Sequence, residues 1–339
     1  MVVDDSAIVR GLIVQMLETS PEIEVVARAS NGQVALAEMD RVEIDLIVLD
    51  LEMPVMDGMT ALPLILAKRP GMPVIVASTL SRRNARISLE ALQRGAADYI
   101  PKPETGTLVN ADDFRRQLLE TVRALGRRPR GQALVQTPTV PMRRPASAAV
   151  RPAVLAIGGS TGAPPVLIRL FTELRAGPDQ AILVTQHMPA TFTALLAEQL
   201  ERAGGRPCAE AREGEPILAG RAYVAPGGLH MTVGRTGATP VIRLTSEPPE
   251  HFCRPAVDPM LRTAAEVYGA RLLAVVLTGM GSDGAEGCRA VARAGGRFVV
   301  QDEASSAVWG MPGAAAQTGL AEAILPASQI SQWVREAAK

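Results

Sequence analysis

The fold of the second half of this chain is decided by Val154-Leu155-Ala156-Ile157-Gly158-Gly159-Ser160-Thr161-Gly162. An apolar run of this kind is typical of a strand that is buried on both faces of a parallel sheet. Two further apolar runs lead to His187 and to Asp283. Parallel α/β sheets carry their functional residues just beyond the carboxyl ends of the strands. We therefore expect Ser160, His187 and Asp283 to meet at one edge of a sheet.

A hydroxyl, an imidazole and a carboxylate are the groups that acyl transfer requires. Gly158-Gly159-Ser160-Thr161-Gly162 fits G-x-S-x-G, in which small neighbours allow a sharp turn that exposes the serine oxygen. Pro164 and Pro165 suit the first turn of a helix after Ser160, and the N–H groups of that helix would favour an oxyanion. Serine also needs a base and the base needs an orienting group, for which His187 and Asp283 are the candidates at strand ends.

Each of these features also has a simpler interpretation. A glycine-rich turn after a strand more often binds phosphate or a dinucleotide, although this one lacks the third glycine of G-x-G-x-x-G. His187 alone would be a turn or core residue, and Asp283 alone would cap a helix beginning near Gly284. The order Ser, His, Asp also differs from the order Ser, Asp, His of α/β-hydrolases. An enzyme of that type would draw its acid and base from Asp179, Asp258, His230 and His251.

The composition narrows the class of protein. The length of 339 residues predicts two domains, and Lys plus Arg equals Asp plus Glu at 35 each. Net charge therefore gives no argument for nucleic acid or an anionic membrane as a partner. Three cysteines without a CxxC motif fit a reducing compartment. With no signal peptide and no apolar stretch near the ~20 residues of a membrane span, we expect a cytoplasmic monomer without membrane insertion.

A basic segment rich in proline separates the two expected domains. From Gly126 to Val150 the chain has five Arg and four Pro but no Asp or Glu. Such a segment buries little apolar surface, so we predict a flexible linker over 126–150 between domains at 1–125 and 151–339. A nucleic-acid-binding arm is the weaker alternative, because the segment has no aromatic residue.

Both domains alternate strand and helix patterns, which predicts the α/β class. In the first domain we expect a helix over 6–17, capped by Ser6, and strands over 23–29, 45–51 and 73–77. The second domain is expected to be doubly wound and mostly parallel. Its short strands at 222–224, 231–233 and 241–245 suggest an antiparallel excursion at one sheet edge.

Five polar residues of the first domain form a candidate phosphorylation site. Asp4, Asp5 and Asp50 follow predicted strands, and three neighbouring carboxylates repel one another unless a hard cation such as Mg²⁺ binds them. Lys102 offers a charge to a phosphate, and Ser78 offers a hydroxyl. Asp50 would then be the nucleophile that accepts a phosphoryl group. Taken singly, such aspartates are usually helix caps and such a lysine is usually solvated.

Residues 1 to about 125 resemble the response-regulator receiver domain, through Val-Asp-Asp-Ser, Leu-Asp-Leu-Glu-Met-Pro-Val-Met-Asp-Gly and Lys-Pro. The resemblance implies a flavodoxin-like, five-stranded parallel sheet of order 2-1-3-4-5 and a histidine kinase as phosphodonor. It makes Asp50 the phosphoacceptor, Lys102 and Ser78 the residues that contact and sense the phosphoryl group, and Asp4, Asp5 and Asp50 the Mg²⁺ ligands. Only Val2 and Val3 remain of the first strand, against a usual ~5–6 residues, so we expect the natural chain to start further upstream.

Residues from about 152 to 335 resemble the catalytic domain of the bacterial chemotaxis protein-glutamate methylesterase, the CheB family. The similarity lies in five separated motifs at 156–162, 185–189, 223–227, 254–258 and 277–284. It implies that Ser160 is the nucleophile, His187 the general base and then acid, and Asp283 the orienting group. Thr161 and Met280 would contribute to the oxyanion and substrate pocket. Gly159 stands where the family commonly has alanine, and Ala163 where it commonly has glycine.

Together the two resemblances imply a phosphorylation-regulated hydrolase. It would remove methyl groups from glutamate γ-methyl esters on the cytoplasmic helices of chemoreceptors, and it would also deamidate glutamine there. Ester hydrolysis would need no cofactor, and Mg²⁺ would serve the receiver only. The alternative is a receiver fused to a non-enzymatic nucleotide- or partner-binding α/β module. A DNA-binding regulator would call for a helix-turn-helix output, against which the α/β pattern after Val150 speaks.

Overall fold

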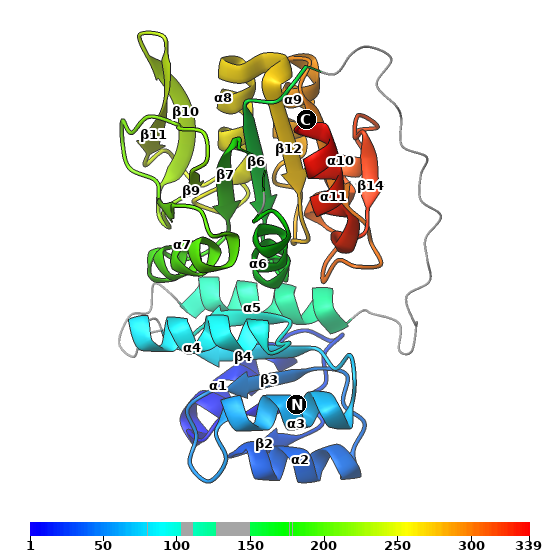
Figure 1. The fold of residues 1–339 in the computed structure, drawn as a ribbon. Coiled ribbons are helices and arrows are strands. Elements are labelled where there is room, and N and C mark those ends of the chain that lie inside the picture. Colours follow the sequence, from blue (N-terminus) through cyan, green and yellow to red (C-terminus); the bar gives the residue numbers. More distant parts are fainter. Residues whose placement is uncertain (80, 103–110, 127–149, 176, 178) are drawn as a thin grey trace. The chain divides into compact units, whose positions relative to one another are not determined.

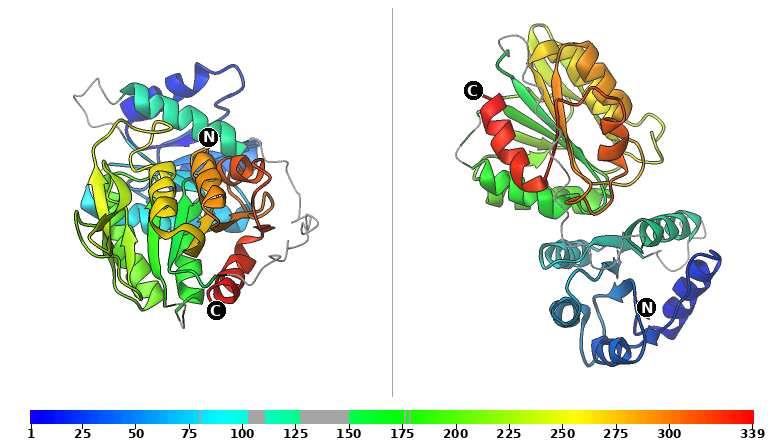
Figure 2. Two further views of the ribbon diagram at one scale, coloured as in Figure 1. Left: turned by 90° about the horizontal axis from the view of Figure 1, so that it is seen from above. Right: turned by 90° about the vertical axis from the view of Figure 1, so that its right-hand side faces the viewer.

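The computed structural model describes residues 1–79, 81–102, 111–126, 150–175, 177 and 179–339. The chain divides into two compact units, Met1–Gly131 and Gln132–Lys339. Each unit is a parallel sheet with helices packed against it (Figures 1 and 2). Residues 127–149 of the linker predicted over 126–150 lie outside the described part of the chain, and Gly126 is the last residue of a helix.

The first unit has a five-stranded parallel sheet of order β2-β1-β3-β4-β5, as predicted. The side chain of Ser6 caps the first helix by accepting a hydrogen bond from the N–H of Val9 at 3.3 Å. The strand predicted over 23–29 is shorter than expected. The elements are β1 (Val2–Val3), α1 (Ala7–Glu18), β2 (Arg28–Ala29), α2 (Gly32–Arg41), β3 (Ile47–Asp50), α3 (Gly58–Lys68), β4 (Val74–Ser78), α4 (Arg82–Gln93), β5 (Asp98–Pro101) and α5 (Ala111–Gly126).

The second unit has a seven-stranded sheet of order β14-β13-β12-β6-β7-β9-β8, and its neighbouring strands pair in parallel. A separate antiparallel pair, β10 and β11, lies beside it. The strands are β6 (Val154–Gly159), β7 (Ala181–Gln186), β8 (Cys208–Glu210), β9 (Ala222–Val224), β10 (His230–Thr236), β11 (Thr239–Thr245), β12 (Leu272–Val276), β13 (Arg297–Gln301) and β14 (Ala323–Leu325). The helices are α6 (Ala163–Glu173), α7 (Ala190–Gly204), α8 (Val257–Tyr268), the 3₁₀ turn η2 (Gly269–Arg271), α9 (Ala285–Arg293), α10 (Met311–Ala316) and α11 (Ala327–Ala337).

The expected antiparallel excursion is correct for β10 and β11 but wrong for the residues of β9. Ala222–Val224 pairs in parallel with both β7 and β8 and is therefore part of the main sheet. Its three residues are all buried, which is typical of a strand covered on both faces. The run is too short for its side-chain pattern to indicate in which direction it pairs.

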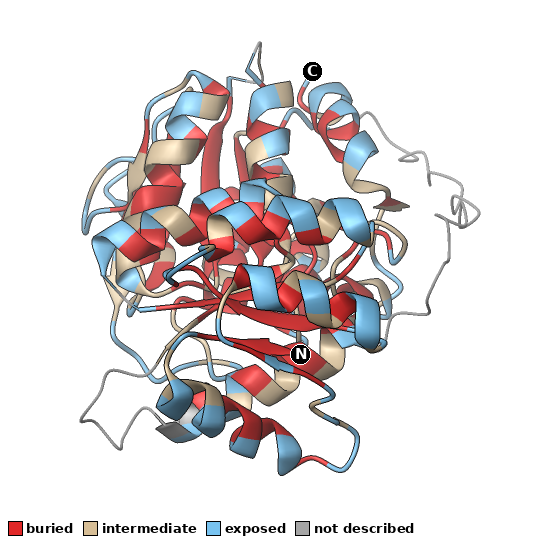
Figure 3. Ribbon diagram, turned by 90° about the horizontal axis from the view of Figure 1, so that it is seen from below, coloured by how far each residue is buried: buried red, intermediate tan, exposed pale blue. Residues whose placement is uncertain are grey.

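The strands that carry the candidate residues lie in the middle of the seven-stranded sheet. β6 pairs with β12 on one side and with β7 on the other, and Gly159 lies opposite Gln186 in the register. Every residue of β6, β7 and β12 is buried, and Figure 3 shows the buried residues on strands and on one side of the helices. In the part of the chain that the structure describes, no helix has the length and apolar character needed to cross a membrane.

Candidate active site and acidic pocket

Ser160 lies at a sharp turn between β6 and α6 that only small residues fit. The backbone of Gly162 has φ 75°, and a Cβ added there would come within 2.2 Å of the Cβ of Ala307. A Cβ on Gly158 would meet Val257 at 2.4 Å. α6 then begins at Ala163 with proline in its first turn, as predicted. The glycines of G-x-S-x-G are thus required by close packing on both sides of Ser160.

His187 and Asp283 form a direct pair, as their positions at strand ends predict. Because Gly159 and Gln186 are paired in register, Ser160 and His187 follow neighbouring strands at the same level of the sheet. The Nε2 atom of His187 lies 2.7 Å from Oδ2 of Asp283, and the side chains are 9% and 1% exposed. The backbone N–H of Ser160 also donates to the carbonyl of Thr278, in the segment that leads to Asp283. The structure therefore joins all three candidates to one sheet edge.

Asp283 caps a helix, although not the one that follows it in sequence. Its oxygens accept hydrogen bonds from the N–H groups of Val257 (2.6 Å) and Asp258 (2.9 Å), at the start of α8. Asp258 in turn accepts from the N–H of Gly287 in α9 at 2.6 Å. Asp283 thus lies at the N-terminus of α8, the helix that carries Asp258. Asp258 lies at the N-terminus of α9, the helix that follows Asp283 in sequence. A helix N-terminus favours negative charge, so both contacts stabilise buried carboxylates.

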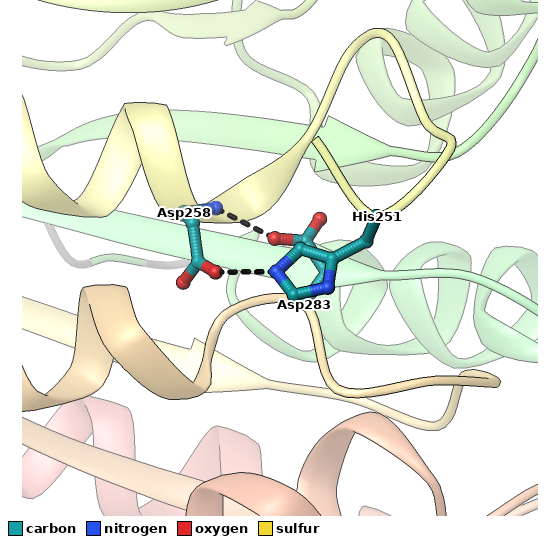
Figure 4. A group of neighbouring side chains, drawn as sticks. All are labelled: His251, Asp258 and Asp283. Carbon is teal, nitrogen blue, oxygen red and sulfur yellow. Dashed lines mark hydrogen bonds and ion pairs between the residues drawn. The ribbon is translucent and has the colours of Figure 1, made fainter. Parts of the chain in front are cut away.

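His251 completes this group, as Figure 4 shows. Its Nε2 atom lies 3.0 Å from Oδ2 of Asp258, and ligand atoms of His251, Asp258 and Asp283 lie within 4.8 Å of one another. Such a cluster resembles a metal site in its composition. Here, however, each carboxylate oxygen is hydrogen-bonded to a backbone N–H or to a histidine ring nitrogen. The hydrogen-bonding needs of both carboxylates are therefore met by the chain itself.

The two carboxyl groups differ in pKa because their partners differ. Burial alone would raise the pKa of Asp283, but the hydrogen bond and charge of His187, with the N–H groups of Val257 and Asp258, lower it. Burial and the charge of Asp283 raise the pKa of Asp258. Burial lowers the pKa of His187, whereas its hydrogen bonds with Asp283 and Cys253 raise it, and the net shift is upward. The pair therefore favours an ionised Asp283 beside an imidazole that readily takes up a proton.

Two residues beside Ser160, and one beside His187, were not predicted from the sequence. Gly279 packs so closely that an added Cβ would lie 2.8 Å from the Cβ of Ser160. Gln186 donates through Nε2 to the carbonyl of Ser160 at 2.9 Å. Cys253, from a segment far away in sequence, lies near His187 and contributes to the raised pKa of its imidazole.

The two predicted pocket residues lie in the same region. Thr161 is 6% exposed, and its carbonyl accepts from the hydroxyl of Thr278 at 3.0 Å. Met280 is partly buried and directly follows Gly279. The two residues thus flank the Ser160 turn, Thr161 from the start of α6 and Met280 from the segment after β12.

The acidic pocket of the first unit is held by a single lysine. The Nζ atom of Lys102 lies 2.7 Å from Asp4 and 2.8 Å from Asp50, and both carboxyl side chains are buried. Asp5 is exposed, yet carboxylate oxygens of Asp4, Asp5 and Asp50 lie within 4.8 Å of one another. Burial is the largest cause that raises the pKa of Asp50, and the charge of Asp4 adds to it, while Lys102 opposes both. Three oxygen donors at this spacing suit a hard divalent cation such as Mg²⁺.

Ser78 lies at the end of β4 and is hydrogen-bonded away from this pocket. Its hydroxyl lies 2.6 Å from that of Ser88, which donates to the carbonyl of Asn84. Asn84 in turn donates to Glu52 and Thr79. The hydroxyl of Ser78 is therefore engaged with α4, and contact with a group on Asp50 would require it to exchange partners.

Comparison with known proteins gives matches for both units. The family model described as CheB methylesterase matches residues 155–334, and that of the response regulator receiver domain matches residues 1–111. The protein-glutamate methylesterase/protein-glutamine glutaminase 1 of Rhodospirillum rubrum is 48% identical, over 100% of this chain and 94% of its own length. A protein of the same name from the group 2 operon of Rhodospirillum centenum is 49% identical, over 100% and 93%. The crystal structure of the Thermotoga maritima CheB methylesterase catalytic domain is 35% identical, with a TM-score of 0.53, and covers 55% of this chain and 99% of its own.

Proposed function

Because this chain belongs to the CheB methylesterase family, we propose that it hydrolyses glutamate γ-methyl esters on chemoreceptors under the control of receiver phosphorylation. The observation that carries the esterase assignment is the 2.7 Å contact between His187 and Asp283 beside the Ser160 turn. A non-enzymatic binding module would not require a buried imidazole that a carboxylate orients next to the Ser160 turn. The similarity of both units to proteins named as glutaminases extends the proposal to deamidation of glutamine.

The chemistry follows from the groups at this edge. A carboxylate only accepts hydrogen bonds, so neutral His187 carries its proton on Nε2 toward Asp283 and has its lone pair on Nδ1. Nδ1 removes the proton of Ser160 as Oγ attacks the ester carbonyl carbon. His187 then returns that proton to the departing methoxide, which leaves as methanol. Water attacks the acyl-enzyme with the same base, and this step releases glutamate and restores Ser160. With glutamine, the leaving group is ammonia.

Asp283 stabilises the imidazolium that forms in each half of this cycle. Its lowered pKa keeps it ionised, and three donors fix its position, so it orients the ring at no cost of reorganisation. We assign Thr161 and Met280 to the oxyanion and substrate pocket, because they flank the Ser160 turn.

In the receiver we propose that Asp50 accepts the phosphoryl group and that Asp4, Asp5 and Asp50 hold Mg²⁺. The ion would offset the repulsion of the carboxylates and of the incoming phosphate. Lys102 already contacts Asp4 and Asp50 and would pair with the phosphoryl oxygens, while Ser78 would exchange Ser88 for them. A histidine kinase of the same pathway is the proposed phosphodonor.

The test is methanol release from a methylated chemoreceptor by the full chain, with and without a small phosphodonor and Mg²⁺. We expect release in both conditions and a higher rate with the phosphodonor. The absence of methanol under both conditions would contradict the esterase assignment. Equal rates would contradict the control by the receiver and leave the esterase assignment standing.

A further inference from the structure

The segment 248–256, which we call the rim loop, joins β11 to α8 in an unfavourable backbone conformation. Its central residues His251 and Phe252 have φ of 51° and 61°. The backbone of residues other than glycine and asparagine rarely adopts this left-handed region, and two such residues in succession are rarer still. Strained backbone of this kind persists only where the surrounding structure imposes it.

Contacts on both sides of the strained residues hold the rim loop. Glu250 pairs with Arg262 of α8 through two hydrogen bonds of 2.8 and 2.6 Å. The N–H of Cys253 donates to the carbonyl of Glu250 at 2.8 Å and closes the turn around His251 and Phe252. The centre of the loop is therefore fixed to a helix whose first turn binds Asp283.

A buried histidine ties the two ends of the rim loop together. The N–H of Ala256 donates to Nδ1 of His230 at 3.2 Å, and Nε2 of His230 lies 3.1 Å from the carbonyl of Pro248. A backbone N–H only donates, so Nδ1 carries the lone pair and Nε2 carries the proton. One neutral ring thus bridges residues eight positions apart, and the shape of the loop is set without any ligand.

The rim loop contacts the candidate active site on either side of Phe252. The following residue, Cys253, lies close enough to His187 to contribute to the raised pKa of the imidazole. The preceding residue, His251, is bonded to Asp258, whose N–H donates to Asp283 (Figure 4). Phe252 therefore lies between two residues that touch the base and its orienting network.

Phe252 is exposed in a chain that otherwise buries its phenylalanines. Its exposure is 80%, whereas the other four are at most 4% exposed: Phe114, Phe171, Phe192 and Phe298. Phe252 is thus both highly exposed and in strained backbone. Backbone strain of this kind clusters at functional sites and ligand-contact positions.

We propose that Phe252 is a substrate-contact residue, which packs against an apolar side chain of the receptor polypeptide next to the methylated glutamate. The inference rests on the proposed esterase function. A methyl ester offers little surface, so binding energy must come from parts of the substrate away from the reacting bond. An aromatic ring offers a large apolar area at a small loss of conformational freedom. The rim loop holds Phe252 next in sequence to Cys253, which lies near His187.

The test compares Phe252→Asn with the wild-type full chain. Asparagine accepts the left-handed backbone, so the substitution removes the ring and keeps the shape of the loop. We expect kcat/KM for methanol release from methylated receptor to fall about tenfold, mainly through KM, as loss of a buried apolar side chain predicts. Phe252→Leu should retain most of the rate. Leu320→Ala removes a half-exposed apolar side chain elsewhere in the same unit and serves as the control.

A second readout separates substrate contact from damage to the active site. A small fluorophosphonate, which reacts with an activated serine, should label Ser160 at the same rate in wild type and Phe252→Asn. Slower labelling of the variant would mean that the loop acts through His187 and would overturn the proposal, as would unchanged kcat/KM on receptor. A wild-type chain that released no methanol would overturn the esterase function and this inference with it.

Discussion

The two units place carboxylates at the same edge of a parallel sheet and satisfy them in different ways. In the receiver, buried Asp4 and Asp50 share Lys102, and the pKa of Asp50 is raised by burial and by Asp4. In the esterase unit, Asp283 takes two backbone N–H groups and His187, and its pKa is lowered.

In the receiver, one lysine faces two buried carboxylates, so negative charge remains that an exchangeable cation can neutralise. In the esterase unit, the charge of Asp283 is stabilised by groups of the chain itself. We infer that a switch needs the first kind of site and that a catalytic base needs the second.

The largest effects should come from breaking the fixed site. Ser160→Ala removes the proposed nucleophile, so methanol release should fall at least ~10³-fold. Asp283→Asn keeps the shape of the side chain but loses the charge that stabilises the imidazolium, so a fall of roughly 10³–10⁴-fold is expected. Initial rates on methylated receptor measure both.

Ser282→Ala alters an exposed hydroxyl next to Asp283 and should keep the wild-type rate. Thermal unfolding of the Ser160 variant should match wild type, because a partly exposed hydroxyl is replaced by hydrogen. A variant Ser160→Ala with more than about a hundredth of the wild-type rate would refute the covalent mechanism.

The exchangeable site should respond to one substitution in a different way. Asp50→Ala removes the proposed phosphoacceptor and leaves the residues of the esterase unit unchanged, so basal methanol release should persist while stimulation by a small phosphodonor disappears. The ratio of rates with and without phosphodonor is the measurement. A fragment starting at Val150 should be equally insensitive, and we expect it to be more active than the unphosphorylated full chain. Continued stimulation of Asp50→Ala would place the phosphoacceptor elsewhere.

The sequence could place Ser160, His187 and Asp283 at one sheet edge because the signals for this are local. Apolar runs locate the strands, and strand ends share an edge, so Ser160, His187 and Asp283 could be placed together. The donors to Asp283 could not be predicted, because Val257 lies 26 residues away and starts a helix with no visible relation to it. The length of β2 was also overestimated, because a local pattern does not show where a strand begins to pair.

Local apolar character alone does not determine where strand pairing begins. Residues 23–26 follow the strand pattern but precede β2, and the sheet contacts begin with the carbonyl of Ala27, which accepts from the N–H of Val2. The rim loop gave no signal either. His251 and Phe252 lack the glycine or asparagine that usually marks left-handed backbone, since contacts distant in sequence impose it.

The close packing of Gly159 against Ala163, next to Ser160, gives a further test of how rigidly the chain holds this site. A Cβ on Gly159 would lie 2.6 Å from the Cβ of Ala163, so the side chains at these two positions compete for the same space. Gly159→Ala alone should therefore lower the free energy of unfolding by about 1–3 kcal/mol through overpacking. Adding Ala163→Gly should recover part of this loss. Urea denaturation of the four proteins of the cycle measures the coupling, and strictly additive effects would show that the residues do not touch.

The smallest effect concerns the unbalanced charge of the receiver. A carboxyl whose pKa is raised on folding lowers stability wherever it is ionised, so the cost of Asp50 is present above its folded pKa and fades as pH falls through it toward 3.8. At neutral pH without Mg²⁺, Asp50→Asn should therefore raise the melting temperature of the receiver by on the order of a few degrees. The gain should shrink at acid pH, and Mg²⁺ should stabilise wild type more than the variant. Asp40→Asn, which alters an exposed carboxyl paired with Lys68, should show neither trend. If Asp50→Asn instead melted lower at neutral pH, the contact with Lys102 would outweigh burial, and the acidic pocket would be balanced by the chain much as the esterase site is.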